Sequence, residues 1–488
     1  MQLVTPLGPG THTPPSSRSS GFPDEIFLPS HDKCVSLIDV YFKMVYSFLP
    51  LFHEETLRSS IAADSSRSAS SRGLLFAVLA LASNERRDER CRALQAQWYE
   101  EAKSQYGSTS HVPDAPIETL QTAVCIILQA MVSGDSSSMW LVLGKAWKQV
   151  VALGYHRLDQ TSVPRIPGAP PLPQDWVQRE AVRRIVWMLY ILDRTACLPI
   201  GLDFTINENQ IGVNLPMGDA LFRYSTASPL GLLSIPYKPN LKRMVAAVRE
   251  AAMQTNHHNT FHHVILNIMM LSNVVSHSRD KEEDPLQDEA LGQLEADLFA
   301  LKISLPRSTT SLTATTYSDL DNAVWVNVLL NLNIIFLNYS KNAASGQISG
   351  THWNHCVTAA RNTVGIIRQA ASMSVDSLLN PYIASAIFLC GRILIIEYLV
   401  PSDATLSPRL WRDIEAITLV FERLEELFGA IGKKFKNGML YYLAQDTRTL
   451  SRIKNSGVKD LLAQCSSWEA AALAASKKNT VECQSWVN

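Results

Sequence analysis

The sequence predicts an all-α protein, a large multi-helix domain of packed antiparallel helix pairs. Apolar residues recur at about 3.6 residues per turn through most of the chain, as on the buried faces of helices. No segment shows strong strand alternation, and no strand–helix–strand rhythm occurs. The break around Gly134 is only a few residues long, which favours an antiparallel arrangement of the two helices that flank it.

The first 30 residues are expected to form a disordered tail. Residues 1 to about 23 are rich in Pro, Ser, Gly and Thr, and such a composition cannot bury enough apolar surface to order the chain. We then expect one domain in two parts. These are a patterned half over residues 31–240 and a helical second half over residues 241–488.

Helical spacing of apolar residues defines the elements of the patterned half. The return helix after Gly134 is expected to place Trp140 and Trp147 inside and to end at Gly154, because glycine readily adopts the left-handed backbone that closes many helices. The helical segments expected up to this point are Asp32–Phe52, a short helix or turn at Glu54–Ile61, Leu74–Ala82, Arg86–Tyr106, a helix capped by Asp114 with Pro116 in its first turn that includes Leu120–Met131, and Ser138–Leu153.

The stretch Arg179–Pro216 is the centre of the predicted fold. Apolar residues from Val182 to Leu192 form one stripe at helical spacing, and Trp187 begins a second row on a neighbouring face. A helix that is apolar on more than one side is buried by several neighbours. We expect it to end before Pro199 and to be followed by an extended segment over Asp203–Leu215.

The second half continues with helices and no defensible motif. Ile383–Val400 is the most membrane-like run, but Arg392 and Glu397 interrupt it, which favours a buried core helix over a membrane span. The expected helical segments are Leu241–His277, Leu291–Leu301, Ala323–Tyr339, His352–Ala371, Pro381–Val400, Ser407–Leu427 and Val458–Ala475.

Composition favours a soluble intracellular protein that is not mainly a nucleic-acid binder. Hydrophobic residues make up 46% of the 488 residues, and 44 basic residues face 45 acidic ones, a balance without the basic surplus of a DNA-binding chain. No pair of cysteines forms a CxxC motif, so we expect buried free thiols in a reducing compartment. The eight cysteines are residues 34, 91, 125, 197, 356, 390, 465 and 483.

No catalytic constellation was found, so the chain is not expected to be an enzyme or to hold a cofactor. Nucleophile elbows, phosphate loops and paired catalytic motifs are absent from the sequence. His258 and His262, four residues apart, could reach one metal ion from one helix face, but the glutamate of an HExxH motif is missing. A polar helix face is the favoured interpretation of these histidines. An all-α metal enzyme remains the less favoured alternative.

The central helix carries charges that need compensation. Arg183 and Arg184 follow Glu180 by one turn, which favours ion pairing over the binding of an acidic ligand or partner. An unpaired buried charge costs several kcal/mol. We therefore expect Asp193 and Arg194 to form structural bridges to flanking segments.

Six segments, in this order and spacing, resemble the fungal-specific transcription factor domain, the middle homology region of binuclear zinc-cluster fungal regulators. They are Tyr41–Leu57, Leu74–Ala82, Glu118–Trp140, Ala146–Arg157, Arg184–Arg194 and Ile200–Pro216. Each segment alone is a weak signal, and the order makes them specific. The resemblance assigns a structural role to ten signature residues: Gly154, His156, Arg157, Arg184, Trp187, Tyr190, Asp193, Arg194, Gly201 and Pro216.

The resemblance implies a transcriptional regulator that works in the nucleus. Its expected partners are proteins of the transcription machinery or a zinc-cluster regulator. A small apolar effector and a homodimer are left open. An effector pocket would lie between helices, with Trp140, Trp147, Trp187 and Tyr190 as candidate lining residues, although core packing is favoured for each.

The family's DNA reader is missing from the sequence. A binuclear zinc cluster needs six cysteines in two groups that contain CxxC, and this chain has neither group. Zinc and DNA binding therefore belong to the family resemblance only. Two explanations stay open: a coding segment upstream of Met1 has been lost, or the protein is a stand-alone helical co-regulator or scaffold that pairs with a zinc-cluster factor.

Overall fold

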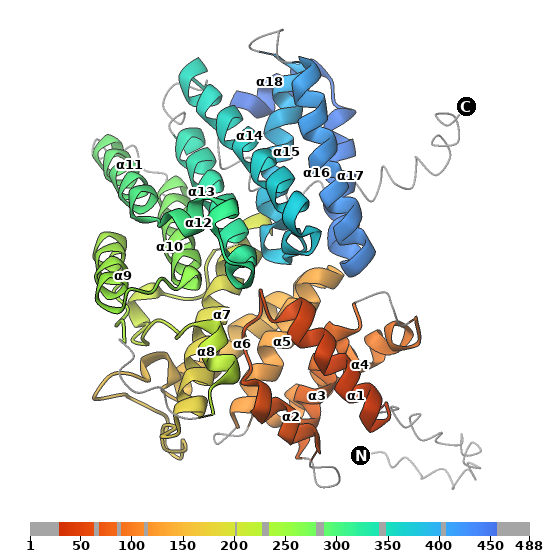
Figure 1. Ribbon diagram of the computed structural model, residues 1–488, viewed down its shortest axis with the longest axis vertical. Coiled ribbons are helices and arrows are strands. Elements are labelled where there is room, and N and C mark those ends of the chain that lie inside the picture. The colour runs from red at the N-terminus through yellow and green to blue at the C-terminus, as the bar shows by residue number, and fades with distance from the viewer. Residues whose placement is uncertain are drawn as a thin grey trace, which may run out of the picture.

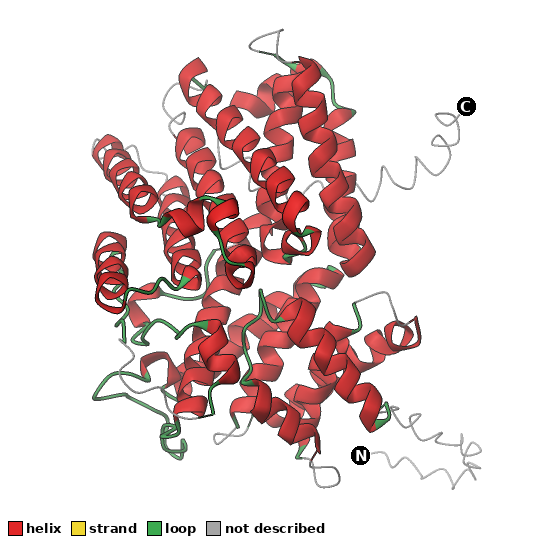
Figure 2. Cartoon of the chain, in the orientation of Figure 1, coloured by secondary structure: helices red, strands yellow, loops and turns green. Residues whose placement is uncertain are grey.

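The computed structural model describes residues 29–62, 68–84, 89–111, 116–200, 203–226, 234–279, 287–340, 348–401 and 407–455. Within these ranges the chain consists of helices and loops without a strand, which confirms the all-α prediction (Figure 2). The helices before residue 240 are α1 (His31–Val40), α2 (Glu54–Ala62), α3 (Ala69–Ala82), α4 (Glu89–Thr109), α5 (Ile117–Ser133), α6 (Ser136–Ala152), α7 (Trp176–Ile200) and α8 (Asp219–Tyr224).

Ten further helices follow in the second half. They are α9 (Leu241–Thr255), α10 (Thr260–Arg279), α11 (Gln287–Ser304), α12 (Arg307–Thr310), α13 (Leu320–Ser340), α14 (Gly350–Met373), α15 (Ala384–Leu399), α16 (Ser407–Phe428), α17 (Ala430–Leu443) and α18 (Thr447–Asn455). Single helical turns include η2 (Tyr155–Arg157) and η3 (Glu208–Gln210).

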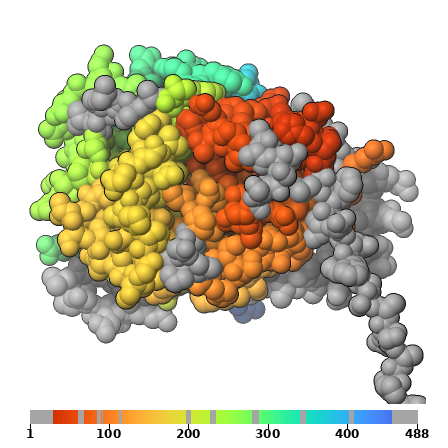
Figure 3. All heavy atoms as spheres, turned by 90° about the horizontal axis from the view of Figure 1, so that it is seen from below, coloured from red at the N-terminus to blue at the C-terminus, as the bar shows by residue number. Residues whose placement is uncertain are grey.

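Consecutive helices pack as neighbours in both halves. In the lower part of Figure 1, α3 packs against α4 and α5, and α5 packs against α6. In the upper part, α13, α14, α15, α16 and α17 form a bundle in which each helix packs against the next. Seen from below, the described part of the surface belongs largely to the first half of the chain (Figure 3).

Helix α7 joins these two parts. It packs against α5 and α6 on one side and against α10 on the other. Residues 185–192 of α7 are fully buried, as its apolar faces predict. One continuous cluster of buried apolar side chains extends from Cys34 in α1 to Ile453 in α18, so the core runs through both parts.

In the part of the chain that the structure describes, two apolar helical stretches, Tyr317–Tyr339 and Pro381–Leu399, are long enough to cross a membrane. In their most apolar windows, 89% and 83% of the residues are buried inside the protein, as in the core helices of globular proteins. Arg392 and Glu397 of the second stretch are also buried, and Lys454 lies 3.6 Å from the Glu397 carboxylate. The second stretch is therefore the buried core helix that the sequence predicts.

The long helical region expected over Leu241–His277 consists of two helices, α9 and α10. Asn256 has a φ angle of 52°, in the left-handed region that asparagine tolerates better than most residues, and the chain turns there. His258 lies in the resulting loop. The expectation that His258 and His262 share one helix face is therefore wrong.

Trp140 and the end of α7 differ from the sequence-based expectation. Trp140 of α6 is 43% exposed, so its expected place inside the protein is wrong, whereas Trp147 is buried. Helix α7 continues to Ile200 and so includes Pro199 in its last turn, two residues beyond the expected end. The helix expected over Val458–Ala475 lies outside the described residues, as do residues 1–28 of the expected tail.

Candidate functional site

Arg184 of α7 connects three segments that are far apart in the sequence. Its guanidinium donates hydrogen bonds to the carbonyl oxygens of Pro50 and Met217, at 2.8 and 2.7 Å. It also pairs with Glu180 at 3.0 Å and with Asp219 at 2.7 Å. The side chain is fully buried. Burial alone lowers the pKa of Arg184, but Asp219 and the other acidic neighbours outweigh it and raise the pKa above its ordinary value, so the group stays charged.

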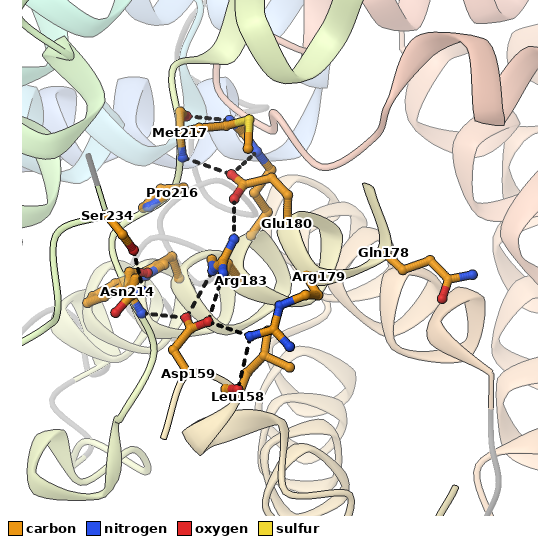
Figure 4. A network of polar contacts seen from close by, with 12 residues as sticks. Leu158, Asp159, Gln178, Arg179, Glu180, Arg183, Asn214, Pro216, Met217 and Ser234 are labelled. Atoms are coloured by element: carbon orange, nitrogen blue, oxygen red, sulfur yellow. Dashed lines mark hydrogen bonds and ion pairs between the residues drawn. The ribbon is translucent and has the colours of Figure 1, made fainter. Parts of the chain in front are cut away.

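Glu180 is the buried carboxylate at the centre of this network (Figure 4). It accepts hydrogen bonds from Arg184 at 3.0 Å, from the Met217 backbone N–H at 2.9 Å and from Arg183 at 3.3 Å. Burial raises the pKa of Glu180, while the charges of Arg184 and Arg183 pull it down. Both of its carboxylate oxygens accept hydrogen bonds within the protein.

Asp159, between η2 and α7, pairs with two arginines of α7 (Figure 4). It accepts from Arg179 at 2.9 Å and from Arg183 at 2.7 and 2.9 Å. It also accepts the backbone N–H of Asn214 at 2.9 Å. Burial raises the pKa of Asp159, but the hydrogen bonds from Arg183 and Asn214 outweigh burial and bring the pKa below its usual range. The extended segment after α7 is thus fastened to the start of the helix.

A second polar cluster fastens the same segment to the end of α7. Arg194 pairs with the neighbouring Asp193 and with Glu208 at 3.2 Å, and donates to the Ile206 carbonyl at 2.9 Å. Asp193 accepts the backbone N–H groups of Thr205 and Ile206 at 2.9 and 3.1 Å. These contacts are bridges to a flanking segment, of the kind expected for this pair of charges.

Trp187 and Tyr190 lie between the two clusters. The indole N–H of Trp187 donates to the Asn214 carbonyl at 2.9 Å, and the Tyr190 hydroxyl donates to Glu208 at 2.7 Å. Burial raises the pKa of Tyr190 well above its ordinary value, so the hydroxyl keeps its proton. Both side chains are fully buried. They contact the protein core and the extended segment.

The remaining signature residues shape the loops that meet α7. Gly154 has a φ angle of 77° and follows the end of α6, as predicted. The His156 carbonyl accepts the Gly212 N–H at 2.7 Å, and Arg157 completes the turn η2. The Pro216 carbonyl oxygen contacts the His262 ring of α10. Gly201 lies outside the described residues.

A cavity of about 720 Å³ opens beside the network. Arg179, Glu180 and Arg183 of α7 form its charged side, and Leu215, Pro216 and Met217 line it from the extended segment. Residues of α9 and the first turns of α10 complete the wall. None of the four aromatic residues proposed from the sequence, Trp140, Trp147, Trp187 and Tyr190, lines this cavity. The packing between helices buries Trp147, Trp187 and Tyr190, whereas Trp140 is exposed to solvent.

Two histidines of α10 line the cavity in different ways. The His262 ring nitrogen Nε2 lies 2.7 Å from the Pro216 carbonyl oxygen and 3.0 Å from the Asn259 side-chain nitrogen. His263 is 3% exposed, and neither of its ring nitrogens has a hydrogen-bond partner. Burial lowers the pKa of His262 to about 4 and, together with His262 and His258, lowers that of His263 to about 3. Both rings are neutral at physiological pH.

The acidic side chains of the site are held by arginines. Asp159, Glu180 and Asp219 are each paired with an arginine. Among the described residues, no group of three or more His, Cys, Asp or Glu side chains could hold a metal ion.

The sequence predicts the pairing of Arg184 with Glu180 and structural bridges from Arg194, but not their partners outside α7. Asp159, Glu208 and Asp219 lie in loops or at a helix start, outside any periodic pattern. The excess of arginine over acid in the first turns of α7 was the available signal, because buried arginines require acidic partners from elsewhere. His262, interpreted from the sequence as part of a polar helix face, is instead buried next to the Pro216 carbonyl.

Comparison with known proteins supplies the context for this site. Residues 38–322 match the family described as the fungal specific transcription factor domain. A citrinin biosynthesis transcriptional activator of Monascus ruber is 28% identical over 192 residues, which cover 38% of this chain and 36% of the relative. An ascochitine biosynthesis cluster transcriptional regulator of Didymella fabae is 28% identical over 194 residues, 39% of this chain and 32% of the relative.

An azaphilone cluster-specific transcription factor of Aspergillus niger is 25% identical over 230 residues, which cover 45% of this chain and 47% of the relative. The chain thus matches between about a third and a half of the length of these relatives.

Proposed function

Because the chain belongs to the fungal specific transcription factor domain family, we propose that it is the regulatory domain of a fungal transcription regulator. The family match includes the whole of α7 and both polar clusters on it. The relatives are transcriptional activators or regulators by name, not enzymes. This supports a role in transcription regulation and not in catalysis.

The contacts of Arg184 are the observation that supports a regulatory domain most directly. The buried guanidinium of Arg184 bonds Pro50 before α2, Glu180 within α7, and Met217 and Asp219 after α7. Helix α7 itself packs against helices of both halves. A body connected in this way can present one continuous surface to another protein.

We propose that the partner is a protein of the transcription machinery or a zinc-cluster regulator, and that the chain acts in the nucleus. The formal net charge of −1 provides no general attraction for DNA phosphates. DNA reading is therefore not assigned to the described residues.

A tethering experiment tests the proposal. The full chain is fused to a heterologous DNA-binding domain in a fungal host, with the matching operator placed before a reporter gene. Since the relatives are named as activators, we expect reporter output several-fold above that of the DNA-binding domain alone. Output equal to that control, with the fusion present in the nucleus at the same level, contradicts the proposal. Output that rises only when a zinc-cluster regulator is co-expressed favours the co-regulator alternative.

A further inference from the structure

Two arginines provide the strongest hydrogen-bond donors in the lining of the cavity beside α7. Arg179 and Arg183 contribute guanidinium groups, which carry N–H donors and no acceptor. His258 and Asn259, between α9 and α10, add side chains that can also donate. Glu180 is the only acidic residue among the described residues that line the cavity. The wall is thus rich in donors and poor in negative charge.

These arginines reach the cavity more than their carboxylate partners do. The side chains of Arg179 and Arg183 are 27% and 17% exposed. Those of Asp159 and Glu180 are only 6% and 1% exposed, and Asp159 does not line the cavity. Both arginines are paired (Figure 4), but with carboxylates that are buried more deeply than they are. A negative group in the cavity would therefore meet guanidinium N–H groups before carboxylate oxygens.

Both arginines keep donors that the described part of the protein does not use. A guanidinium group has five N–H donors. Arg183 uses three of them, two on Asp159 and one on Glu180. Arg179 also uses three, on Asp159 and on two backbone carbonyl oxygens. Its Nε has no acceptor and is not among the buried unsatisfied atoms, so this donor is accessible from outside the protein.

The size of the cavity indicates an organic ligand rather than a small inorganic ion. Its volume is about 720 Å³, within the range of about 300–1,000 Å³ that small-molecule pockets occupy. An inorganic anion would contact the arginines and leave most of this space to water. The carbon-rich side chains of Trp176, Val248 and Ala251 also line the cavity and can contact the body of an organic molecule.

A carboxylate suits these donors in shape and in charge. It is planar, and its two oxygens can accept parallel hydrogen bonds from a guanidinium group. Carboxylic acids ionise at about pH 4 and so are charged at neutral pH. Asp159 and Glu180 already compensate part of the charge of the two arginines. The cavity therefore matches a single negative charge better than a polyanion.

We propose that this cavity binds a small organic acid, and that Arg179 and Arg183 pair with the carboxylate of that acid. The proposal goes beyond the regulatory role and does not depend on it, because binding is a property of the purified chain. For Arg183, the sequence offers ion pairing and the binding of an acidic ligand as alternatives. The two are compatible in this arrangement, since the pairs with Asp159 and Glu180 leave part of each guanidinium group for a ligand.

A matched pair of probes tests the proposal. 2-Naphthoate and 2-naphthamide share one aromatic bicycle and nearly the same shape, and they differ in charge. Binding of each probe to the purified full chain is measured by titration calorimetry. We expect the wild-type chain to bind 2-naphthoate at least about ten-fold more tightly, which corresponds to about 1.4 kcal/mol. Added sodium chloride should reduce this preference, because salt screens the attraction between charges that solvent can reach.

A pair of arginine variants tests the assigned residues. Arg179→Gln removes the charge and keeps an amide donor, and it should lower the preference to less than about three-fold without weakening the binding of 2-naphthamide. Arg249→Gln is the matched control, because Arg249 lies on α9 but does not line the cavity, and it should keep the full preference. Thermal melts of both variants show whether they are folded.

Ala252→Phe tests the location independently of the arginines. Ala252 lines the cavity from α9, so the larger side chain should fill part of the space and abolish the binding of both probes. This variant also supplies a test if Arg179→Gln does not fold. The proposal is overturned if neither probe binds the wild type or if both bind equally. It is also overturned if the preference survives in Arg179→Gln, or if Ala252→Phe binds the probes as the wild type does. The tethering experiment can fail without altering any of these outcomes.

Discussion

At the scale of single residues, Arg184 contributes more to the fold than its position in an apolar helix suggests. Its guanidinium contacts two carboxylates and two backbone carbonyls, and all four partners lie in or beside the buried core. Removing one partner of such a cluster leaves the others buried and unsatisfied. The contrast with arginines on the surface is large, because solvent screens exposed pairs.

We predict that Arg184→Met lowers the free energy of unfolding by about 3–5 kcal/mol, the usual cost of breaking a buried ion pair. The matched control is Arg423→Met, since Arg423 and its partner Glu426 in α16 are 49% and 46% exposed. That change should cost no more than about 1 kcal/mol. Urea denaturation of the two variants measures both values. Equal losses in the two proteins would show that the Arg184 network is not special.

His263 should make the protein sensitive to acid. Its pKa is about 3 in the folded chain and about 6.5 when unfolded, so the unfolded state binds the proton first as the pH falls. The stability that comes from the neutral ring is complete above about pH 6.5 and is lost progressively towards about pH 3. His262, with a folded pKa of about 4, acts in the same direction.

Acidification from about pH 7 to about pH 5 should therefore cost the wild type about 2 kcal/mol more than His263→Leu, which lacks this titrating group. The free energy of unfolding of both proteins, measured at the two pH values, gives this difference. Parallel losses in the two proteins would contradict the depressed pKa of His263.

At the scale of elements, the end of α6 depends on the backbone of Gly154. Its φ angle is 77°, and a Cβ atom built there would lie 2.5 Å from Cγ of Arg165 and 2.8 Å from Cγ1 of Val163. Gly144, within the same helix, has nothing within 4 Å of its Cβ position. A Cβ atom would therefore clash with its neighbours at position 154 but would meet open space at position 144.

Gly154→Ala should therefore lower the melting temperature, with a loss of at least about 1–2 kcal/mol from the left-handed backbone alone. Gly144→Ala should instead raise stability by about 0.5–1 kcal/mol, since alanine favours the helix. Thermal melts of the two variants measured side by side provide the comparison. A gain in Gly154→Ala would show that the helix end can rearrange.

The elements could be predicted from the sequence where one residue pattern dominates. The apolar stripe from Val182 to Leu192 predicted helix α7 and its burial, and Gly154 predicted where α6 ends. The turn between α9 and α10 was missed because Asn256 lies in a polar run that a helix could also contain. Trp140 was misplaced because helical spacing does not distinguish an exposed aromatic residue from a buried one.

At the scale of the whole molecule, the fold depends on contacts between residues that are far apart in the sequence. Arg184 and Pro50 are 134 residues apart in the sequence, and no local pattern links them. The signature residues on α7 could be identified, whereas the partners that surround them and the cavity beside them required the assembled fold. The same contacts connect the two halves through one core.

We predict that the halves do not fold when separated. Residues 29–240 and 241–455, expressed apart, should each lack a cooperative thermal transition, because α7 would lose α10 and α5 would lose α17. Near-ultraviolet circular dichroism and thermal melts of the two fragments test this. Two monomeric fragments with sharp transitions would instead indicate two independent domains.

Reporter output from the tethered full chain tests the assignment as a regulatory domain most directly. The wild-type fusion should activate the reporter several-fold, Arg423→Met should match it, and Arg184→Met should lose most of the activation at an equal protein level. A wild-type fusion that leaves the reporter at the level of the DNA-binding domain alone would contradict the assignment. Full activation by Arg184→Met would contradict the role given to the α7 network.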